Sequence, residues 1–145
     1  MSGARKQSAS TQGEVTDDNF VCVLDASALL ALLHSEPGAE IVEEVVEGAA
    51  ISTVNWAEVY QRWLAHEVDV TDLRPDLEAL GIQIVPFIVE DAEQAVELWR
   101  LTRHQGLSLG DRACLGLARR LGLPALTADR AWLDVNSGVE VQAIR

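Results

Sequence analysis

Lysine is almost absent from this sequence of 145 residues, in which Lys6 is the only one. A Walker A nucleotide site, a Schiff-base enzyme and a receiver domain each need a lysine inside the folded domain, whereas Lys6 lies in a polar N-terminal segment. Neither a GxSxG nucleophile motif nor a catalytic cysteine–histidine pattern occurs. The sequence therefore disfavours all of these classes.

Cysteine and histidine are also scarce. Cys22 lies in an apolar run and Cys114 in a helical pattern, so we expect two small buried side chains rather than a disulfide or a CxxC pair, which suits a reducing compartment. His34, His66 and His104 lack the spacing of zinc ligands and are expected on helix surfaces. A zinc site is therefore disfavoured.

Long apolar runs are missing, since no segment approaches the roughly 18 residues of a membrane span. Residues 1–19 are polar and rich in Ser, Thr, Gln and Gly, which is unlike a signal peptide and predicts a disordered leader or a cloning remnant. Residues 20–145 have the length and composition of one domain. We expect a cytoplasmic protein with no membrane contact.

Positive charge is in short supply, because the net charge is -12. From residue 14 to residue 97 there are 19 acidic residues against two arginines, whereas residues 100–130 contain six arginines and two aspartates. A nucleic-acid-binding protein usually has the opposite balance, but a local basic surface can still guide one polyanion. The acidic body favours a basic protein partner, or it is simply a solvated face.

Short apolar runs that alternate with helical patterns predict a three-layer α/β/α sandwich with a mainly parallel central sheet. The helix after the first strand is expected to be capped by Ser27 and to end at Pro37. In the helix at 90–104, Ala92, Ala95, Val96, Trp99 and Thr102 form the apolar face. The predicted strands are 20–24, 50–54, 82–85, 124–127 and 139–144, and the other helical segments are 39–47, 56–64, 75–80, 108–121 and 130–133.

Acidic residues recur where these strands end and the next helices begin, namely Asp25, Glu58, Asp111 and Asp129. Each has an ordinary explanation, because 55–58 and 108–111 have the form of capping boxes and Asp129 suits an N-cap. As a set they predict more. Four carboxylates at one edge of a parallel sheet would repel one another unless a cation lay between them, and oxygen ligands favour Mg²⁺, with Mn²⁺ as a substitute.

Four segments resemble the motifs of the PIN domain family, and more narrowly its VapC-type toxins. These segments are VLDASAL at 23–29, TVNWAEV at 53–59, LSLGDRA at 107–113 and LTADRAW at 126–132. They occur in the order of that family, and the resemblance covers about residues 21–144. It implies a Mg²⁺-dependent endoribonuclease that works as a homodimer and is held inactive by an antitoxin.

The resemblance also assigns residues. Asp25, Glu58, Asp111 and Asp129 match the acidic positions of the family, while Ser27 and Thr127 match hydroxyls near its metal, although a helix cap and a strand end explain them equally well. Arg112 and Arg130 adjoin two of the acids and are candidates to contact substrate phosphates. Asp134 lies just beyond the last motif in a context that suits a surface turn, so it stays outside the set.

These assignments predict hydrolysis of RNA phosphodiesters by metal-activated water, with Asp25 and Asp111 as direct ligands and Glu58 and Asp129 completing the site. The four tryptophans are expected to supply core or interface area rather than to stack on bases. Two alternatives remain open. The chain could be a non-catalytic interaction module whose acids only cap helices, or a metal-dependent DNA nuclease or phosphatase that uses the same acids.

Overall fold

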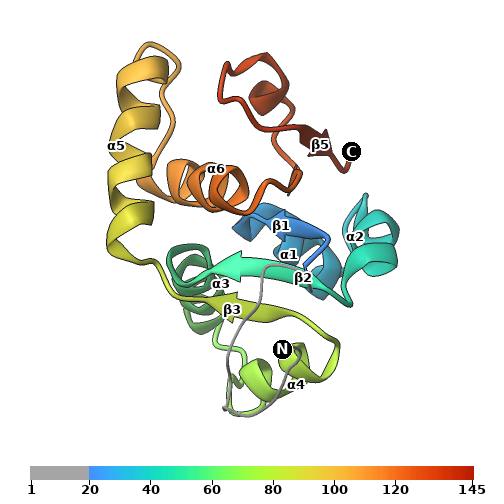
Figure 1. Ribbon diagram of the computed structural model, residues 1–145. Coiled ribbons are helices and arrows are strands. Elements are labelled where there is room, and N and C mark those ends of the chain that lie inside the picture. Colours follow the sequence, from blue (N-terminus) through green and yellow to red (C-terminus); the bar gives the residue numbers. More distant parts are fainter. Residues whose placement is uncertain (1–19) are drawn as a thin grey trace, which may run out of the picture.

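The computed structural model describes residues 20–145, so the leader predicted at residues 1–19 lies outside the described residues. Figure 1 shows strands that are separated along the chain by one or two helices. The strands are β1 (Cys22–Leu24), β2 (Ala49–Ser52), β3 (Gln83–Val85), β4 (Ala125–Thr127) and β5 (Val141–Ala143). The helices are α1 (Ala26–His34), α2 (Ala39–Val45), α3 (Thr53–Ala65), α4 (Leu73–Ala79), α5 (Val89–Thr102) and α6 (Leu109–Leu121), together with the 3-10 helix η2 (Arg130–Asp134).

The five strands form one parallel sheet in the order β3-β2-β1-β4-β5. At its centre Val23 of β1 lies between Ala50 of β2 and Ala125 of β4. The chain therefore builds outward from β1 in one direction through β2 and β3, and later in the other direction through β4 and β5. Ligands of open α/β sheets bind beyond the carboxyl ends of the strands at such a reversal of strand order.

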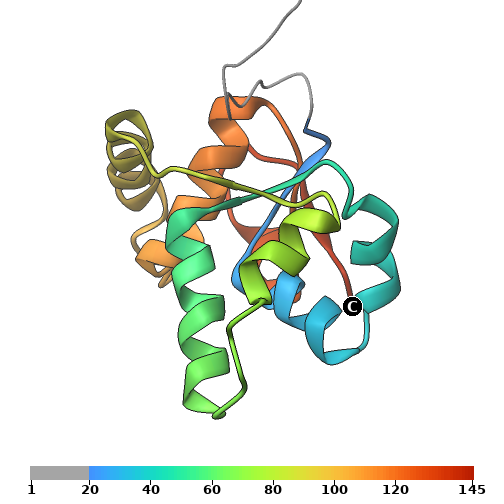
Figure 2. The same cartoon turned by 90° about the horizontal axis from the view of Figure 1, so that it is seen from below.

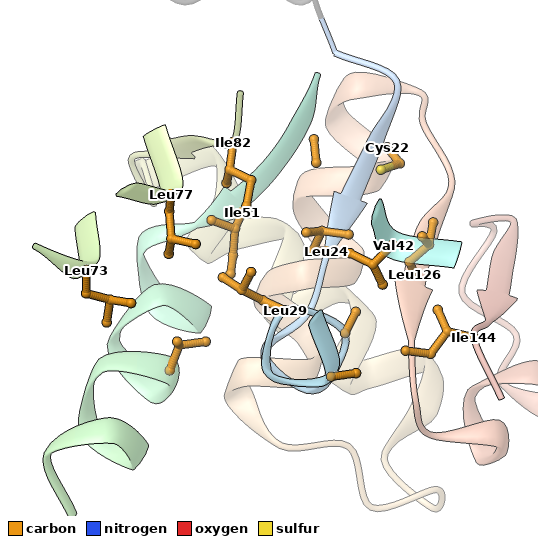
Figure 3. Packing of buried hydrophobic residues seen from close by; sticks show 14 residues of the cluster. Cys22, Leu24, Leu29, Val42, Ile51, Leu73, Leu77, Ile82, Leu126 and Ile144 are labelled. Carbon is orange, nitrogen blue, oxygen red and sulfur yellow. The ribbon is translucent and has the colours of Figure 1, made fainter. Parts of the chain in front are cut away.

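Alternate residues of each central strand pack into separate cores on the two faces of the sheet. Leu24 and Leu126 point into the core formed with α1, α2, α3 and α4, which Figure 3 shows from close by. Val23 and Ala125 point into the core formed with α5, α6 and η2. In Figure 2, α5 and α6 lie to the left of the strands and α2 to the right. The predicted three-layer α/β/α class is confirmed.

Two predicted helix starts are wrong, because in each case the helix begins directly at the end of a strand. Asp25 caps α1 in place of Ser27, and its side chain accepts from the backbone N–H of Ala28. Ser52 caps α3, so Asn55 lies inside the helix and does not begin a capping box. The capping box of Ser108 with Asp111 in α6 is present as predicted.

The inner face of α5 also differs from the prediction. Ala95 and Thr102 are buried, but Val96 is 62% and Trp99 46% exposed, while Asp91 and Leu98 take the inner positions. The reason is that α5 lies alongside α6 (Figures 1 and 2), so only a narrow stripe of its surface is covered. Arg120 of α6 reaches Asp91 and makes an acid tolerable at that buried position.

The prediction for the two cysteines is confirmed. Cys22 and Cys114 are free and buried, and the three histidines are exposed. Trp132 is buried in the core. Within residues 20–145, none of the helices is both long enough and apolar enough to cross a bilayer.

Candidate active site at the carboxyl edge of the sheet

The four predicted acids meet at one cleft beyond the carboxyl ends of β1 and β4. Asp25 follows β1, Asp129 follows β4, Glu58 lies in α3, and Asp111 lies in the first turn of α6. The cleft has a volume of about 240 Å³. Its lining consists of Asp25, Ala26, Ser27, Leu30, Asn55, Glu58, Arg62, Asp111 and Asp129. Residues that lie as far as 104 positions apart in the sequence therefore share one surface.

Asp25 is the most enclosed of the four acids, with only 6% of its surface exposed. Its Oδ1 accepts from the backbone N–H of Ala28 at 2.8 Å and from the Ser27 hydroxyl at 2.7 Å, and its Oδ2 accepts from the Thr127 hydroxyl at 2.6 Å. Burial raises the pKa of Asp25 to about 6, although these hydrogen bonds oppose the shift, and the nearby charge of Asp111 adds to it.

Ser27 and Thr127 use their hydroxyls to join the start of α1 to the loop after β4. The Ser27 hydroxyl accepts from the backbone N–H of Ala128 at 2.9 Å, and the Thr127 hydroxyl accepts from that of Asp129 at 3.0 Å. Each hydroxyl also donates to Asp25. The two side chains therefore orient the Asp25 carboxylate and fix the position of the loop that contains Asp129.

Glu58 is held more loosely than Asp25. Its Oε1 accepts one hydrogen bond, from the Asn55 amide at 3.1 Å, and the same amide nitrogen donates to the carbonyl of Gly110 at 3.0 Å. Burial raises the pKa of Glu58, the Asn55 hydrogen bond opposes that rise, and the charge of Asp111 adds to it. The charge of Asp111 thus raises the pKa of two other acids of the cleft.

Asp111 and Asp129 both cap helices, as their ordinary explanation requires. Asp111 Oδ2 accepts from the backbone N–H of Ser108 at 3.0 Å, and Asp129 Oδ1 accepts from that of Ala131 at 3.0 Å. In each residue the other carboxylate oxygen has no hydrogen-bond donor among residues 20–145. A capping role therefore leaves one oxygen of each side chain for a ligand in the cleft.

The structure directs the two predicted arginines away from the cleft. Arg112 donates to the carbonyl of Ala95 on α5 at 2.8 Å, and Arg130 donates to the carbonyl of Arg145 at 3.3 Å. Adjacency in the sequence was a poor guide, because neighbouring residues of a helix point in different directions.

Arg62 lines the cleft instead, one helical turn after Glu58. Sequence reasoning missed this residue, although its spacing of four from Glu58 places both side chains on the same face of α3. Asp134 is exposed and does not line the cleft, in agreement with its exclusion from the set.

A divalent ion suits the chemistry of this cleft. Its donors are carboxylate, amide and hydroxyl oxygens, and two of its acids have raised pKa values that a nearby cation would lower. The amide oxygen of buried Asn55 has no hydrogen-bond partner among the residues described. However, no three His, Cys, Asp or Glu side chains within residues 20–145 are grouped so that they could hold a metal ion. An ion held by three of these side chains would therefore require at least one carboxylate to change its rotamer.

The sequence profile of the PIN domain matches residues 22–137. None of the curated proteins matches the chain in sequence.

Several solved structures have a similar fold. A toxin–antitoxin complex from Klebsiella pneumoniae contains a chain that is 20% identical, with a TM-score of 0.66, and the match covers 86% of this chain and 98% of that one. FitAcB from Neisseria gonorrhoeae is 17% identical with a TM-score of 0.63 and the same coverage of both chains. VapBC-1 from nontypeable Haemophilus influenzae is 14% identical with a TM-score of 0.66, again covering 86% and 98%. At these identities the likeness establishes the fold.

Proposed function

This chain belongs to the PIN domain family, and from that premise we propose that it is a metal-dependent endoribonuclease and the toxin of a type II toxin–antitoxin pair. The observation that supports this function best is the convergence of Asp25, Glu58, Asp111 and Asp129 on one cleft where the strand order reverses. Helix capping alone would not bring Glu58, an interior residue of α3, to the same cleft as the other three acids. The domain that performs this function spans residues 20–145, and we place it in the cytoplasm.

The proposed cofactor is Mg²⁺, with Mn²⁺ as a substitute. When bound, such an ion would activate water for attack on phosphorus and stabilise the leaving oxygen. Asp25 and Asp111 are the proposed direct ligands, and Glu58 and Asp129 would complete the site. The hydroxyls of Ser27 and Thr127 would keep the Asp25 carboxylate in one orientation while the ion binds.

Arg62 is the cation that we propose as the contact to a substrate phosphate, in place of Arg112 and Arg130. It lines the cleft, and its guanidinium forms no ion pair within the described residues. A single arginine beside several carboxylates would orient an RNA strand at the cleft without neutralising the site. Binding to RNA is therefore expected to be weak until the carboxylates hold a cation.

The decisive experiment is cleavage of RNA with Mn²⁺, with Mg²⁺ and with chelator by the wild type, Asp25→Asn and Asp111→Asn. We expect metal-dependent cleavage by the wild type and a loss of more than about 100-fold in the variants, because even residues that only support metal ligands contribute about 10- to 100-fold. Asp134→Asn is the matched control, since this exposed acid lies outside the cleft. Equal activity of all four proteins would refute the assignment.

The product ends test the chemistry. Attack by water predicts 5′-phosphate and 3′-hydroxyl ends, whereas 2′,3′-cyclic phosphates would mean that the ribose hydroxyl attacks. DNA and a small phosphoester serve as parallel substrates, because a DNA nuclease or phosphatase could use the same acids. Preferential cleavage of either would replace RNA as the proposed substrate.

A non-catalytic interaction module is the second candidate, and two observations favour it. The carboxylates are not grouped for metal binding among the described residues, and the net charge is -12. Thermal unfolding with added Mn²⁺ separates the two functions, since a real site raises the melting temperature in proportion to the logarithm of free metal while dispersed caps do not.

The proposed partner is an antitoxin with a basic segment, because the cleft is acidic and the similar Klebsiella structure is described as a toxin–antitoxin complex. Co-purification from the native host tests this pairing. A homodimer is proposed as well, and sedimentation analysis of the purified chain tests it. A chain that is harmless when expressed alone and retains no basic protein would contradict the toxin assignment.

A further inference from the structure

Helices α3 and α6 approach each other closely beside Glu58, at Asn55 and Gly110. The Asn55 amide donates to Glu58 Oε1 at 3.1 Å and to the carbonyl of Gly110 at 3.0 Å. One side chain therefore ties the acid of α3 to the backbone residue that precedes Asp111 in α6. Asn55 is only 1% exposed, so this bridge is shielded from competing water.

Gly110 leaves the space that the Glu58 carboxylate occupies. A Cβ at Gly110 would lie 2.8 Å from both Cδ and Oε1 of Glu58 and closer still to Oε2, a separation that real side chains do not tolerate. The backbone angle φ of Gly110 is not positive, so its conformation does not demand glycine. Since glycine within a helix costs up to about 1 kcal/mol relative to alanine, the close approach of the carboxylate explains the residue.

We propose that Asn55 and Gly110 are a pair of positioning residues that holds the Glu58 carboxylate beside Asp111. This inference rests on the proposed function, in which both acids serve one cation. Glu58 is an exposed residue whose carboxylate has no other hydrogen bond among residues 20–145. Without Asn55 and without the space at Gly110, its side chain would sample several rotamers and spend most of its time in solvent.

The unsatisfied amide oxygen of Asn55 supports a role for this residue in the site. Its amide oxygen is buried and has no hydrogen-bond partner within the described part of the chain, which costs free energy of folding. If position 55 served only to pack α3 against the sheet, an apolar side chain there would make the fold more stable. The geometry of the amide nitrogen, which bridges two acceptors, accounts for the asparagine.

Gly110→Ala is the sharpest test, because it separates positioning from folding. The new methyl group would displace only the far end of a flexible side chain, and alanine favours the helix, so the melting temperature should stay level or rise. We expect Mn²⁺ affinity and kcat to fall by about 10- to 100-fold, as for residues that support metal ligands, while KM for RNA stays within about twofold. Asn55→Ala should show the same loss of affinity and rate.

Gly116→Ala is the matched control, since Gly116 lies in the same helix and its Cβ would make an ordinary contact, 3.4 Å from the Cβ of Gln94. It should keep wild-type Mn²⁺ affinity and activity. The double variant Gly110→Ala/Glu58→Gln should lose no more Mn²⁺ affinity or kcat than Glu58→Gln alone, because both substitutions act through one carboxylate. Additive losses would overturn the proposal.

A crystal structure of Gly110→Ala provides a readout that needs neither metal nor RNA. We expect the Glu58 carboxylate to have left Asn55, and finding it in place would overturn the inference. If the wild type binds Mn²⁺ but cuts no RNA, the proposed function fails while the positioning pair is still tested by Mn²⁺ affinity. A folded Gly110→Ala protein with unchanged Mn²⁺ affinity would refute the pair and leave the nuclease assignment intact.

Discussion

Asp91 and Asp25 are both buried aspartates of this fold, but only Asp91 is paired with an arginine. Asp91, in the layer formed by α5 and α6, binds Arg120 through both carboxylate oxygens, at 2.6 and 3.2 Å. Asp25, at the edge of the sheet, is surrounded by two hydroxyls and a backbone N–H instead. None of the ion pairs among residues 20–145 involves Asp25.

This difference separates an acid that stabilises the fold from one that is available to a ligand. A buried charge needs compensation, and Asp91 has it within the chain. The hydroxyls around Asp25 orient its carboxylate but leave it without a positive neighbour, so its pKa rises to about 6. The negative charge of Asp25 must therefore be neutralised by a proton or by a cation from the solvent. The comparison predicts opposite responses of the two regions to substitution, to pH and to metal.

The largest expected effect is on the paired aspartate. Arg120→Met leaves the Asp91 carboxylate buried and uncompensated, so the free energy of unfolding at pH 7 should fall by about 3–5 kcal/mol. Urea unfolding measures this loss. Adding Asp91→Leu should restore most of the stability, because an apolar pair of similar volume can replace a buried ion pair. If Arg120→Met alone leaves the free energy of unfolding unchanged, Asp91 does not need its arginine. The contrast between Asp91 and Asp25 would then be wrong.

The next effect is the pH dependence of the metal-free protein. Because the pKa of Asp25 is raised from 3.8 in the unfolded chain to about 6, the folded state binds the extra proton. The contribution of Asp25 to stability is therefore greatest below about pH 4, is lost as pH rises through 6, and amounts to about 3 kcal/mol. The raised pKa of Glu58 acts in the same direction.

The difference in unfolding free energy between the wild type and Asp25→Asn, followed from pH 4 to pH 8, isolates this contribution. Asparagine carries no charge, so the variant should be the more stable protein above pH 6 without metal. Saturating Mn²⁺ should reverse that order, since the proposed ion would bind only the ionised carboxylate of the wild type. If the difference in unfolding free energy does not vary with pH, the pKa of Asp25 is not raised in the folded protein.

A smaller effect is expected when one of the hydroxyls around Asp25 is removed. Thr127→Val keeps the shape of the side chain but deletes the donor to Asp25 Oδ2, so Mn²⁺ affinity should fall by about 10-fold. Isothermal titration calorimetry measures the affinity. Thr102→Val is the matched control, because that buried hydroxyl donates to the carbonyl of Leu98 in α5, outside the cleft. Equal Mn²⁺ affinities of Thr127→Val and Thr102→Val would mean that the Thr127 hydroxyl does not support the Asp25 carboxylate.

The smallest expected effect concerns the arginine at the rim of the cleft. Arg62→Gln should weaken RNA binding several-fold and reduce the slope of log affinity against log salt by about 0.7, the value for one contact to single-stranded phosphate. Arg112→Gln is the comparison variant, because Arg112 is directed towards α5. Binding measured across a salt series distinguishes them, and a change of slope in Arg112→Gln alone would reverse the assignment.

The sequence predicted the order of the elements well, because apolar runs of strand length and the helical periodicity are local signals. It also predicted that the four acids would meet, since each follows a strand or opens a helix. It failed where two residues compete for one role. Asp25 and Ser27 can both cap α1, and the structure has β1 end at Leu24 with Asp25 at the N-cap.

The other failures depended on distant partners. Asp91 faces inward on α5 because Arg120, 29 residues later, reaches it, and no local pattern reveals that pair. The same holds for the bridge from Asn55 to Gly110, which joins residues 55 positions apart. Glycine at position 110 was visible in the sequence, but its purpose depends on where Glu58 lies in three dimensions.

The reversal of strand order at β1 has a consequence for the protein during its own synthesis. Asp25 and Glu58 are synthesised early, with β1 and α3, whereas Asp111 and Asp129 are synthesised later, with α6 and β4. A nascent chain on the ribosome therefore has no complete set of acids until β4 has emerged and docked against β1. If the proposed ribonuclease activity requires all four acids, fragments released by premature termination would not cleave RNA.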